Sequence, residues 1–153
     1  MCTELHWTAY LTAMLTPTVA LLGALIAFWQ WRVAENKHKF ELFDRRFTVF
    51  EAVSNFTASI MTNGKAHDVE IYNFIRATRE AKWLFNSEVA EYIEKQLYYK
   101  ALELQTLDAE LKGVPISEER SKNVHAQADI KKWFAVQHAV IDKMFSPYLQ
   151  LKL

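Results

Sequence analysis

The longest apolar stretch of the chain lies near its N-terminus. Residues 5–31 contain no Asp, Glu, Lys or Arg, and about 20 apolar residues are enough for a helix to cross the hydrocarbon core of a bilayer. Trp7 and Tyr10 lie near one end of this stretch, and Trp29 and Trp31 lie at the other, as aromatic residues do at both membrane interfaces. The pattern predicts a transmembrane helix within an N-terminal segment of residues 1–32.

The flanking charges predict how this helix is oriented. Glu4 is the only charged side chain before it, whereas a basic cluster follows it, formed by Arg32, Lys37, Lys39, Arg45 and Arg46. Because basic residues accumulate on the cytoplasmic side, we expect the N-terminus outside and the remaining chain in the cytoplasm. A cleaved signal peptide would start with basic residues, and a buried core helix would be shorter and amphipathic, so both alternatives are less favoured.

Apolar positions at helical spacing predict about four helices in a cytosolic domain of residues 33–153. The first, over residues 33–62, continues the membrane helix, because no Gly or Pro interrupts it. It carries a stripe of Phe40, Phe43, Phe47 and Phe50, which recur at intervals of three and four residues. The turn pair Asn63 and Gly64 ends this helix.

The other helices are expected over residues 67–85, 88–112 and 118–145. Asn86 or Ser87 is the predicted N-cap of the second of these, and Ser117 that of the third, while Gly113 and Pro147 follow helix ends. Short connections between helices favour a bundle. The residues predicted to face its interior are Ile71, Phe74, Ile75, Ala81, Phe85, Val89, Ile93, Leu97, Leu104, Leu107, Leu111, Ile130, Trp133, Phe134, Ile141 and Met144. The predicted fold is therefore all-α, with a transmembrane helix continuous with a helical bundle.

Composition and motifs argue against several classes of function. The chain has 18 basic and 18 acidic residues, whereas a general nucleic-acid-binding protein has a basic excess. Its single cysteine, Cys2, allows neither an intramolecular disulfide nor a thiolate metal cluster. The sequence lacks P-loop, Rossmann, HExxH, GxSxG and CxxC motifs. We therefore expect no enzymatic activity, no cofactor and no bound metal.

The predicted helix over residues 67–85 carries a candidate ligand site. On an uninterrupted α-helix, Tyr72, Arg76, Arg79 and Trp83 fall within about 60° of one another, away from the apolar face. Aromatic rings stack on planar bases and arginine binds phosphate, so this face suits an anionic, planar ligand. The alternative is a solvated basic face, with a cation–π contact such as Arg79 on Trp83.

Arg46 is a second candidate ligand residue, because it projects among Leu42, Phe43, Phe50 and Val53. A charge in apolar surroundings needs a partner or a ligand. The alternative is an ion pair with an acid of another helix or subunit.

A third face of possible contacts carries Tyr92, Lys95 and Tyr99, which we expect on the outside of the helix over residues 88–112. Exposed tyrosines are enriched at protein interfaces. This face is therefore a candidate for pairing subunits, with a plain solvated surface as the alternative.

The run FELFDRRFTVFEAV at residues 40–53, directly after a membrane helix, resembles runs in uncharacterised small bacterial single-pass membrane proteins. This resemblance, over residues of about 15–55, implies an inner-membrane location and no particular activity. By layout alone, the chain is also similar to membrane effectors of type III CRISPR defence. That likeness implies a homo-oligomer that senses cyclic oligoadenylate and perturbs the membrane.

Together these features lead us to expect a ligand-gated membrane effector, in contact with lipid, that binds a cyclic nucleotide in antiviral defence. The alternative is a membrane-anchored adaptor or structural subunit that binds a partner protein through the same Tyr/Arg face.

Overall fold

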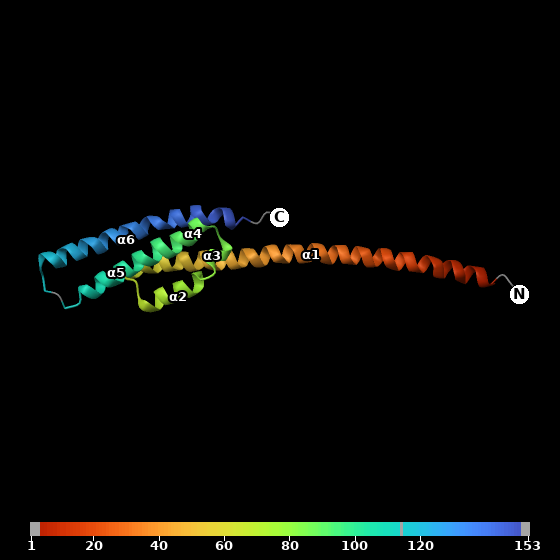
Figure 1. Cartoon of the computed structure of the whole chain (residues 1–153), viewed down its shortest axis with the longest axis horizontal. Helices are drawn as coiled ribbons and strands as arrows, with labels where there is room; N and C mark the ends of the chain where they lie inside the picture. Colours follow the sequence, from red (N-terminus) through yellow and green to blue (C-terminus); the bar gives the residue numbers. More distant parts are fainter. Residues whose placement is uncertain (1–3, 114, 151–153) are drawn as a thin grey trace. The chain divides into compact units, whose positions relative to one another are not determined.

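The structure is a computed structural model that describes residues 4–113 and 115–150. Contacts divide the chain into two compact units, Met1–Glu41 and Leu42–Leu153. Within the described ranges every regular element is a helix and there is no strand, so the predicted all-α class is confirmed (Figure 1). The side chains of Glu4 and Trp7, which were used in the membrane prediction, lie outside the part that the structure describes, and so does Cys2.

Helix α1 spans Glu4–Asn63 and contributes residues to both units. Its stretch Ala13–Asn63 contains a window that is long and apolar enough to cross a membrane, and no residue of that window is buried. Large apolar side chains project outward there, among them Leu21 and Trp29, which are 66% and 71% exposed. By length and composition, α1 therefore meets the requirement for a membrane anchor.

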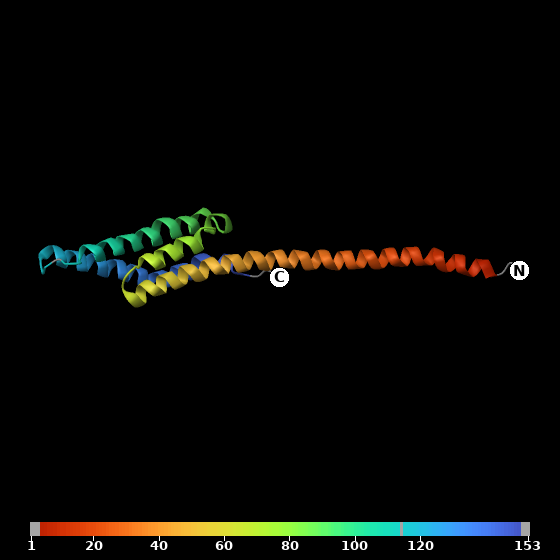
Figure 2. The ribbon, with the colours of Figure 1, turned by 90° about the horizontal axis from the view of Figure 1, so that it is seen from below.

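The second unit is a bundle with four main helical segments, drawn from yellow to blue in Figure 2. They are the C-terminal part of α1; α2 (Asp68–Thr78); the consecutive α4 (Ser87–Glu91), η1 (Tyr92–Tyr98) and α5 (Tyr99–Glu110); and α6 (Glu118–Phe145). Two short elements complete it, α3 (Ala81–Leu84) after α2 and the 3₁₀-helix η2 (Ser146–Tyr148) after α6.

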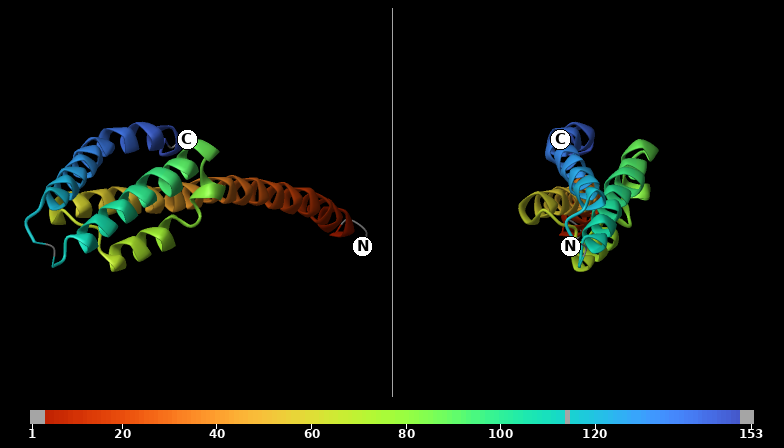
Figure 3. Two further views of the ribbon diagram at one scale, coloured as in Figure 1. Left: turned by 60° about the vertical axis from the view of Figure 1, so that its left-hand side comes forward. Right: turned by 90° about the vertical axis from the view of Figure 1, so that its left-hand side faces the viewer.

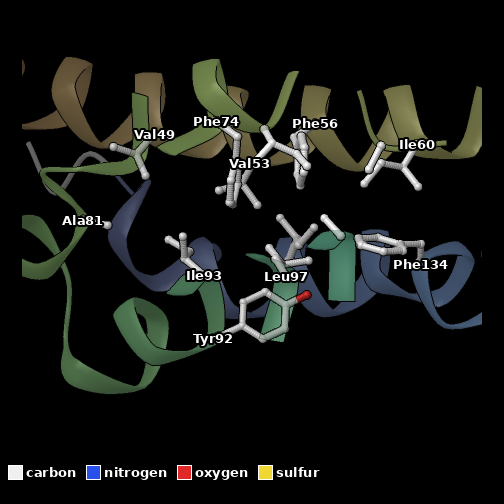
Figure 4. Packing of buried hydrophobic residues seen from close by; sticks show 14 of the residues in the cluster. Val49, Val53, Phe56, Ile60, Phe74, Ala81, Tyr92, Ile93, Leu97 and Phe134 are labelled. Carbon is white, nitrogen blue, oxygen red and sulfur yellow. The ribbon is translucent and has the colours of Figure 1, made fainter. Parts of the chain in front are cut away.

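Apolar side chains from these segments meet in one core (Figure 4). Val53 and Ile60 of α1 are fully buried, as are Leu97 of η1 and Phe134 of α6. The predicted phenylalanine stripe is not the main core face of α1, since Phe40 and Phe47 are 51% and 43% exposed. The buried positions are Val49, Val53, Phe56 and Ile60, also at intervals of three and four residues. Both faces of α1 are apolar, so the packing partners decide which one is buried.

Local signals end and begin the helices as expected. The Asn86 side chain accepts a hydrogen bond from the Val89 amide at 3.0 Å, and the Ser117 hydroxyl accepts one from the Arg120 amide at 3.2 Å. The predicted bounds of α6 are confirmed. Gly64 and Gly113 adopt positive φ angles of 65° and 82° in the turns after α1 and α5, a conformation that glycine adopts without steric cost.

The predicted helix over residues 67–85 is interrupted. α2 ends at Thr78, Arg79 and Glu80 form a turn, and α3 begins at Ala81. Ile75, expected inside, is 46% exposed, whereas Thr78 is buried. The Thr78 hydroxyl donates a hydrogen bond of 2.7 Å to the Phe74 carbonyl one turn earlier. This bond meets the hydrogen-bonding requirement of the buried hydroxyl.

The predicted helix over residues 88–112 is formed by α4, η1 and α5, which follow one another as a helical rod drawn in green to teal (Figure 3). Its middle part, η1, is a π-helix. In a π-helix the backbone bonds run from i to i+5, so side chains seven residues apart no longer share a face as they do in an α-helix. Tyr92 is consequently 4% exposed and Tyr99 58% exposed. The prediction that Tyr92 lies on the outer face with Lys95 and Tyr99 is therefore wrong for Tyr92.

Candidate ligand-binding pocket

A pocket of about 300 Å³ lies in the second unit, lined by residues of α2, the following turn, α3, α4 and η1. Its apolar lining includes Phe74, Ala81 and Ile93, which are all buried. Its polar lining includes Arg79, Lys82, Glu94 and Tyr98. Such a combination of apolar walls and a few polar groups is typical of small-molecule sites.

Local backbone geometry creates this pocket. The turn at Arg79 and Glu80 separates α2 from α3, and residues before, within and after the turn line the pocket. The opposite wall comes largely from the π-helix, which supplies Ile93, Glu94 and Tyr98. π-Helical segments are rare and occur frequently at functional sites.

The charged groups of the pocket do not neutralise one another. In the part of the chain that the structure describes, neither Arg79 nor Glu94 forms an ion pair within 4.0 Å. Lys82 places its Nζ atom 4.3 Å from the centroid of the Trp83 ring, a cation–π contact. Two cations and one carboxylate thus line the pocket, and the excess positive charge favours an anionic ligand.

Two other hollows in the bundle have a different charge. One of about 620 Å³ between α4 and α6 is lined by one acid, Glu88, and one base, Lys143. Another of about 250 Å³ between α1 and α2 is lined by Glu70 without a cation. The Glu70 carboxylate there accepts hydrogen bonds from the Ser59 hydroxyl and the Asn63 amide. Neither hollow has an excess of positive charge.

Only one of the four residues of the predicted Tyr/Arg face lines the pocket. Arg79 lines the pocket, whereas Tyr72, Arg76 and Trp83 do not. Tyr72 and Trp83 are 65% and 69% exposed, and Arg76 is also exposed. The wheel projection assumed one uninterrupted helix, and the turn after Thr78 breaks that assumption. The cation over Trp83 is Lys82, whereas the sequence suggested Arg79.

Arg46 is half-buried and held by groups of its own chain. Its Nε atom donates a hydrogen bond to the Leu84 carbonyl at 3.1 Å, and its guanidinium carbon lies 5.4 Å from the centroid of the Tyr148 ring. The expected need for a partner is thus met by a backbone carbonyl and an aromatic ring. Arg46 does not line the pocket.

Sequence reasoning missed Lys82, Glu94 and Tyr98 as pocket residues. Glu94 and Tyr98 are four residues apart, but nothing in that spacing distinguishes them from a solvated helix face. The described residues contain no group of three or more His, Cys, Asp or Glu side chains able to hold a metal ion. The polar groups of the pocket are instead guanidinium, ammonium, carboxylate and phenol groups, together with the Thr78 hydroxyl, which donates to the Phe74 carbonyl.

Comparisons with protein-family models, with curated proteins and with solved structures found no match to this chain.

Proposed function

We propose that this chain is a membrane-anchored protein whose helical bundle binds a small anionic ligand, with a nucleotide as the expected class. The observation that carries the proposal is the pocket beside η1, where Arg79 and Lys82 line the same hollow as buried apolar side chains. Arginine and lysine bind phosphate oxygens, and apolar walls accommodate a flat base.

The membrane part of the proposal rests on α1. Its apolar residues are exposed within the chain, and burying them in lipid removes that apolar surface from water. The proposed arrangement is a single span in a bacterial inner membrane with the N-terminus outside. The bundle, and with it the pocket, would then face cytoplasmic nucleotides.

The size of the pocket limits the ligand. About 300 Å³ lies at the lower end of the ~300–1,000 Å³ range of ligand pockets. One pocket therefore suits a single nucleotide unit. A cyclic oligonucleotide would have to occupy the pockets of several copies, which is consistent with the proposed homo-oligomer.

Ligand gating and a role in antiviral defence complete the proposal. A ligand shifts a conformational equilibrium only by its differential affinity for the two states. The π-helix, which lines the pocket, is the proposed element that responds. Dye release from liposomes that contain the purified chain, measured before and after nucleotide addition, tests gating. Unchanged leakage upon saturating binding would contradict it.

Calorimetric titration and thermal unfolding of the full chain in mild detergent test ligand binding. The panel contains inorganic phosphate, pyrophosphate, mononucleotides and cyclic nucleotides. Arg79→Gln and Lys82→Gln should each weaken binding by about 1 kcal/mol or more, because each removes a charged contact. Arg76→Gln is the matched control, since Arg76 is an exposed arginine near the end of α2 that does not line the pocket. Affinity should also fall as salt rises.

A second candidate function is that of an adaptor, and the exposure of Tyr72, Arg76 and Trp83 favours it. Tyrosine, tryptophan and arginine are enriched among the residues that dominate protein interfaces. If this function is correct, Tyr72→Ala and Trp83→Ala abolish capture of a specific partner and Arg79→Gln does not. If the wild-type protein binds a specific partner protein and binds no anion, the adaptor function replaces the ligand-binding function as our proposal.

A further inference from the structure

We infer that the pocket beside η1 selects guanine nucleotides over adenine nucleotides. This inference rests on the proposed function, because it names the base of the anionic ligand that the pocket would bind. The base it names differs from the adenine of the cyclic oligoadenylate that the likeness in layout implies. The inference is based on Glu94. This acid lines the same hollow as Arg79 and Lys82 and forms no ion pair with either in the structure.

A carboxylate that lines an anion-binding pocket requires an explanation. Glu94 weakens the attraction of the pocket for a simple anion such as phosphate, because like charges repel. An ionised carboxylate also has no hydrogen to donate and accepts hydrogen bonds only. The side chain therefore suits a ligand that carries hydrogen-bond donors at some distance from its own negative charge.

Guanine meets this requirement. Its Watson–Crick edge carries two adjacent donors, the N1 hydrogen and the N2 amino group, and a carboxylate can accept from both in a bidentate arrangement. Adenine presents the unprotonated N1 atom at the corresponding position. A lone pair that faces an acceptor-only carboxylate is repelled and is left without a hydrogen bond.

The remaining pocket residues fit the other parts of a nucleotide. Phe74 and Ile93 supply a buried apolar wall for the base. The Tyr98 ring, which also contacts the Tyr99 ring at a centroid distance of 5.6 Å, adds an aromatic surface on which a base can stack. Arg79 and Lys82 are assigned to the phosphate, since both carry donors and no acceptor; Lys82 would exchange its contact with the Trp83 ring for this one. Every charged group of the pocket thus has a complementary group on one ligand.

Calorimetric titration of the full chain in detergent with GMP, AMP and pyrophosphate tests the inference. GMP and AMP carry the same phosphate, so the difference between them reports the base. GMP should bind about tenfold more tightly than AMP, in line with the strength of charge-assisted hydrogen bonds. Inosine monophosphate, which keeps the N1 hydrogen and lacks the amino group, should bind with intermediate affinity.

Glu94→Gln should reduce the preference for GMP to about twofold or less, because the amide offers a donor as well as an acceptor. Glu94 is exposed, so this variant should fold, and its unliganded melting temperature checks that. Glu91→Gln is the matched control, since Glu91 precedes the π-helix and pairs with Lys95 outside the pocket. The control should keep the preference.

The outcomes separate the two proposals. Equal binding of GMP and AMP to wild type, or a preference that survives Glu94→Gln, overturns guanine selection and leaves anion binding intact. Failure of pyrophosphate and of every nucleotide to bind overturns the proposed function together with this inference.

Discussion

Arg46 shows how one side chain can join three segments of the bundle. It leaves α1 at the start of the second unit, donates to the carbonyl of Leu84 at the end of α3, and lies against the ring of Tyr148. A half-buried charge that lost these contacts would be poorly solvated. The main role of Arg46 in this structure is therefore to connect α1, α3 and the C-terminal segment.

We predict that Arg46→Met lowers the free energy of unfolding by about 1–3 kcal/mol, because it removes a charged donor and leaves the Leu84 carbonyl unpaired. Thermal unfolding of the full chain should show a melting temperature several degrees lower. Nucleotide affinity should not change, since Arg46 does not line the pocket.

Arg45→Met is the control for this prediction. Arg45 is adjacent in sequence, but its side chain is 68% exposed and 3.8 Å from Glu80. An exposed pair of this kind contributes at most about 1 kcal/mol. Equal losses in the two variants would contradict the structural role of Arg46, and lost nucleotide affinity in Arg46→Met would restore it as a ligand residue.

Asp108 on α5 links that helix to the turn after α1. Lys65 Nζ lies 2.8 Å from its Oδ1 atom. The hydrogen bond from Lys65, assisted by the charges of Lys65, Lys112 and Lys131, lowers the pKa of Asp108 below its usual value, although burial opposes this shift. The carboxylate form is therefore favoured in the folded chain.

This lowered pKa predicts a specific acid response. The unfolded chain has the usual Asp pKa of about 3.9, so the contribution to stability is present above that pH. It is lost as the pH falls through the lower pKa of the folded chain. Melting temperatures measured from about pH 6 to pH 3 should fall less steeply for Asp108→Asn than for wild type. Asp129→Asn, which changes an exposed pair with Lys132, should show the same fall in melting temperature as wild type. An equally steep fall for Asp108→Asn would contradict the prediction.

The π-helix η1 is the element on which the pocket most depends. Its first residue, Tyr92, is buried and donates a hydrogen bond of 2.7 Å to Gln137 Oε1 on α6, while the Gln137 amide donates to the Trp133 carbonyl at 2.9 Å. A buried polar pair must stay satisfied. This pair therefore fixes η1 on α6 and with it the direction of Glu94 and Tyr98.

We predict that Tyr92→Phe lowers the free energy of unfolding by about 1–3 kcal/mol at neutral pH, because Gln137 Oε1 loses its donor in a buried place. Nucleotide affinity should also fall if η1 shifts. Tyr99→Phe is the control, since Tyr99 is 58% exposed. Thermal unfolding and calorimetric titration measure the two effects, and an unchanged melting temperature for Tyr92→Phe would contradict the prediction.

Tyr92 also predicts an alkaline response. Burial raises its pKa to about 12, above the usual value of about 10. The resulting stabilisation is complete below pH 10 and is lost as the pH rises toward the folded-state value. Wild type should therefore lose stability more steeply than Tyr92→Phe between about pH 10 and pH 12, as thermal unfolding at stepped pH would show. Parallel curves for the two proteins would argue against a buried phenol.

The helices that could be predicted from sequence are those with local signals. α6 has Ser117 as its cap and Pro147 after its end, and both bounds were predicted correctly. The π-helix has no such signal, and the buried hydrogen bond that anchors its first residue joins Tyr92 to Gln137, 45 positions away. The turn after Thr78 likewise lacks a Gly or Pro to mark it.

In the candidate site, too, some residues could be predicted from local sequence signals and others could not. Arg79 could be selected because a basic residue near aromatic rings has recognisable chemistry. Lys82 and Glu94 could not, because they reach one pocket only through the turn at residues 79–80 and the π-helix. An α-helical projection places side chains by a fixed angle per residue, and both departures change that angle.

At the scale of the whole molecule, the formal net charge is zero, but positive charge is locally in excess. The chain has 18 basic and 18 acidic residues, and several lysines pair with an acid on their own helix, as Lys39 does with Glu35 and Lys122 with Glu118. Among the residues that the structure describes, Arg76 and Arg79 have no such partner. A balanced net charge, although it is not typical of a general nucleic-acid binder, is therefore compatible with a local anion site.

The topology of the whole chain can be tested through its single cysteine. Cys2 lies before the apolar stretch, and no other cysteine competes for labelling. If the N-terminus is outside, a membrane-impermeant maleimide should label Cys2 in intact bacterial spheroplasts. In a Cys2→Ser background, Ser121→Cys places a reporter at an exposed position of α6, and it should be labelled only after lysis.

The reverse pattern would affect the function as well as the topology. Labelling of the α6 reporter in intact cells, with Cys2 protected until lysis, would place the bundle outside. Arg79, Lys82 and Glu94 would then face a compartment without the cytoplasmic nucleotide pool. A nucleotide-gated effector would no longer fit, and the exposed Tyr72 and Trp83 would make an extracytoplasmic adaptor the better hypothesis. The expected pattern instead keeps the pocket and its proposed ligand in the same compartment.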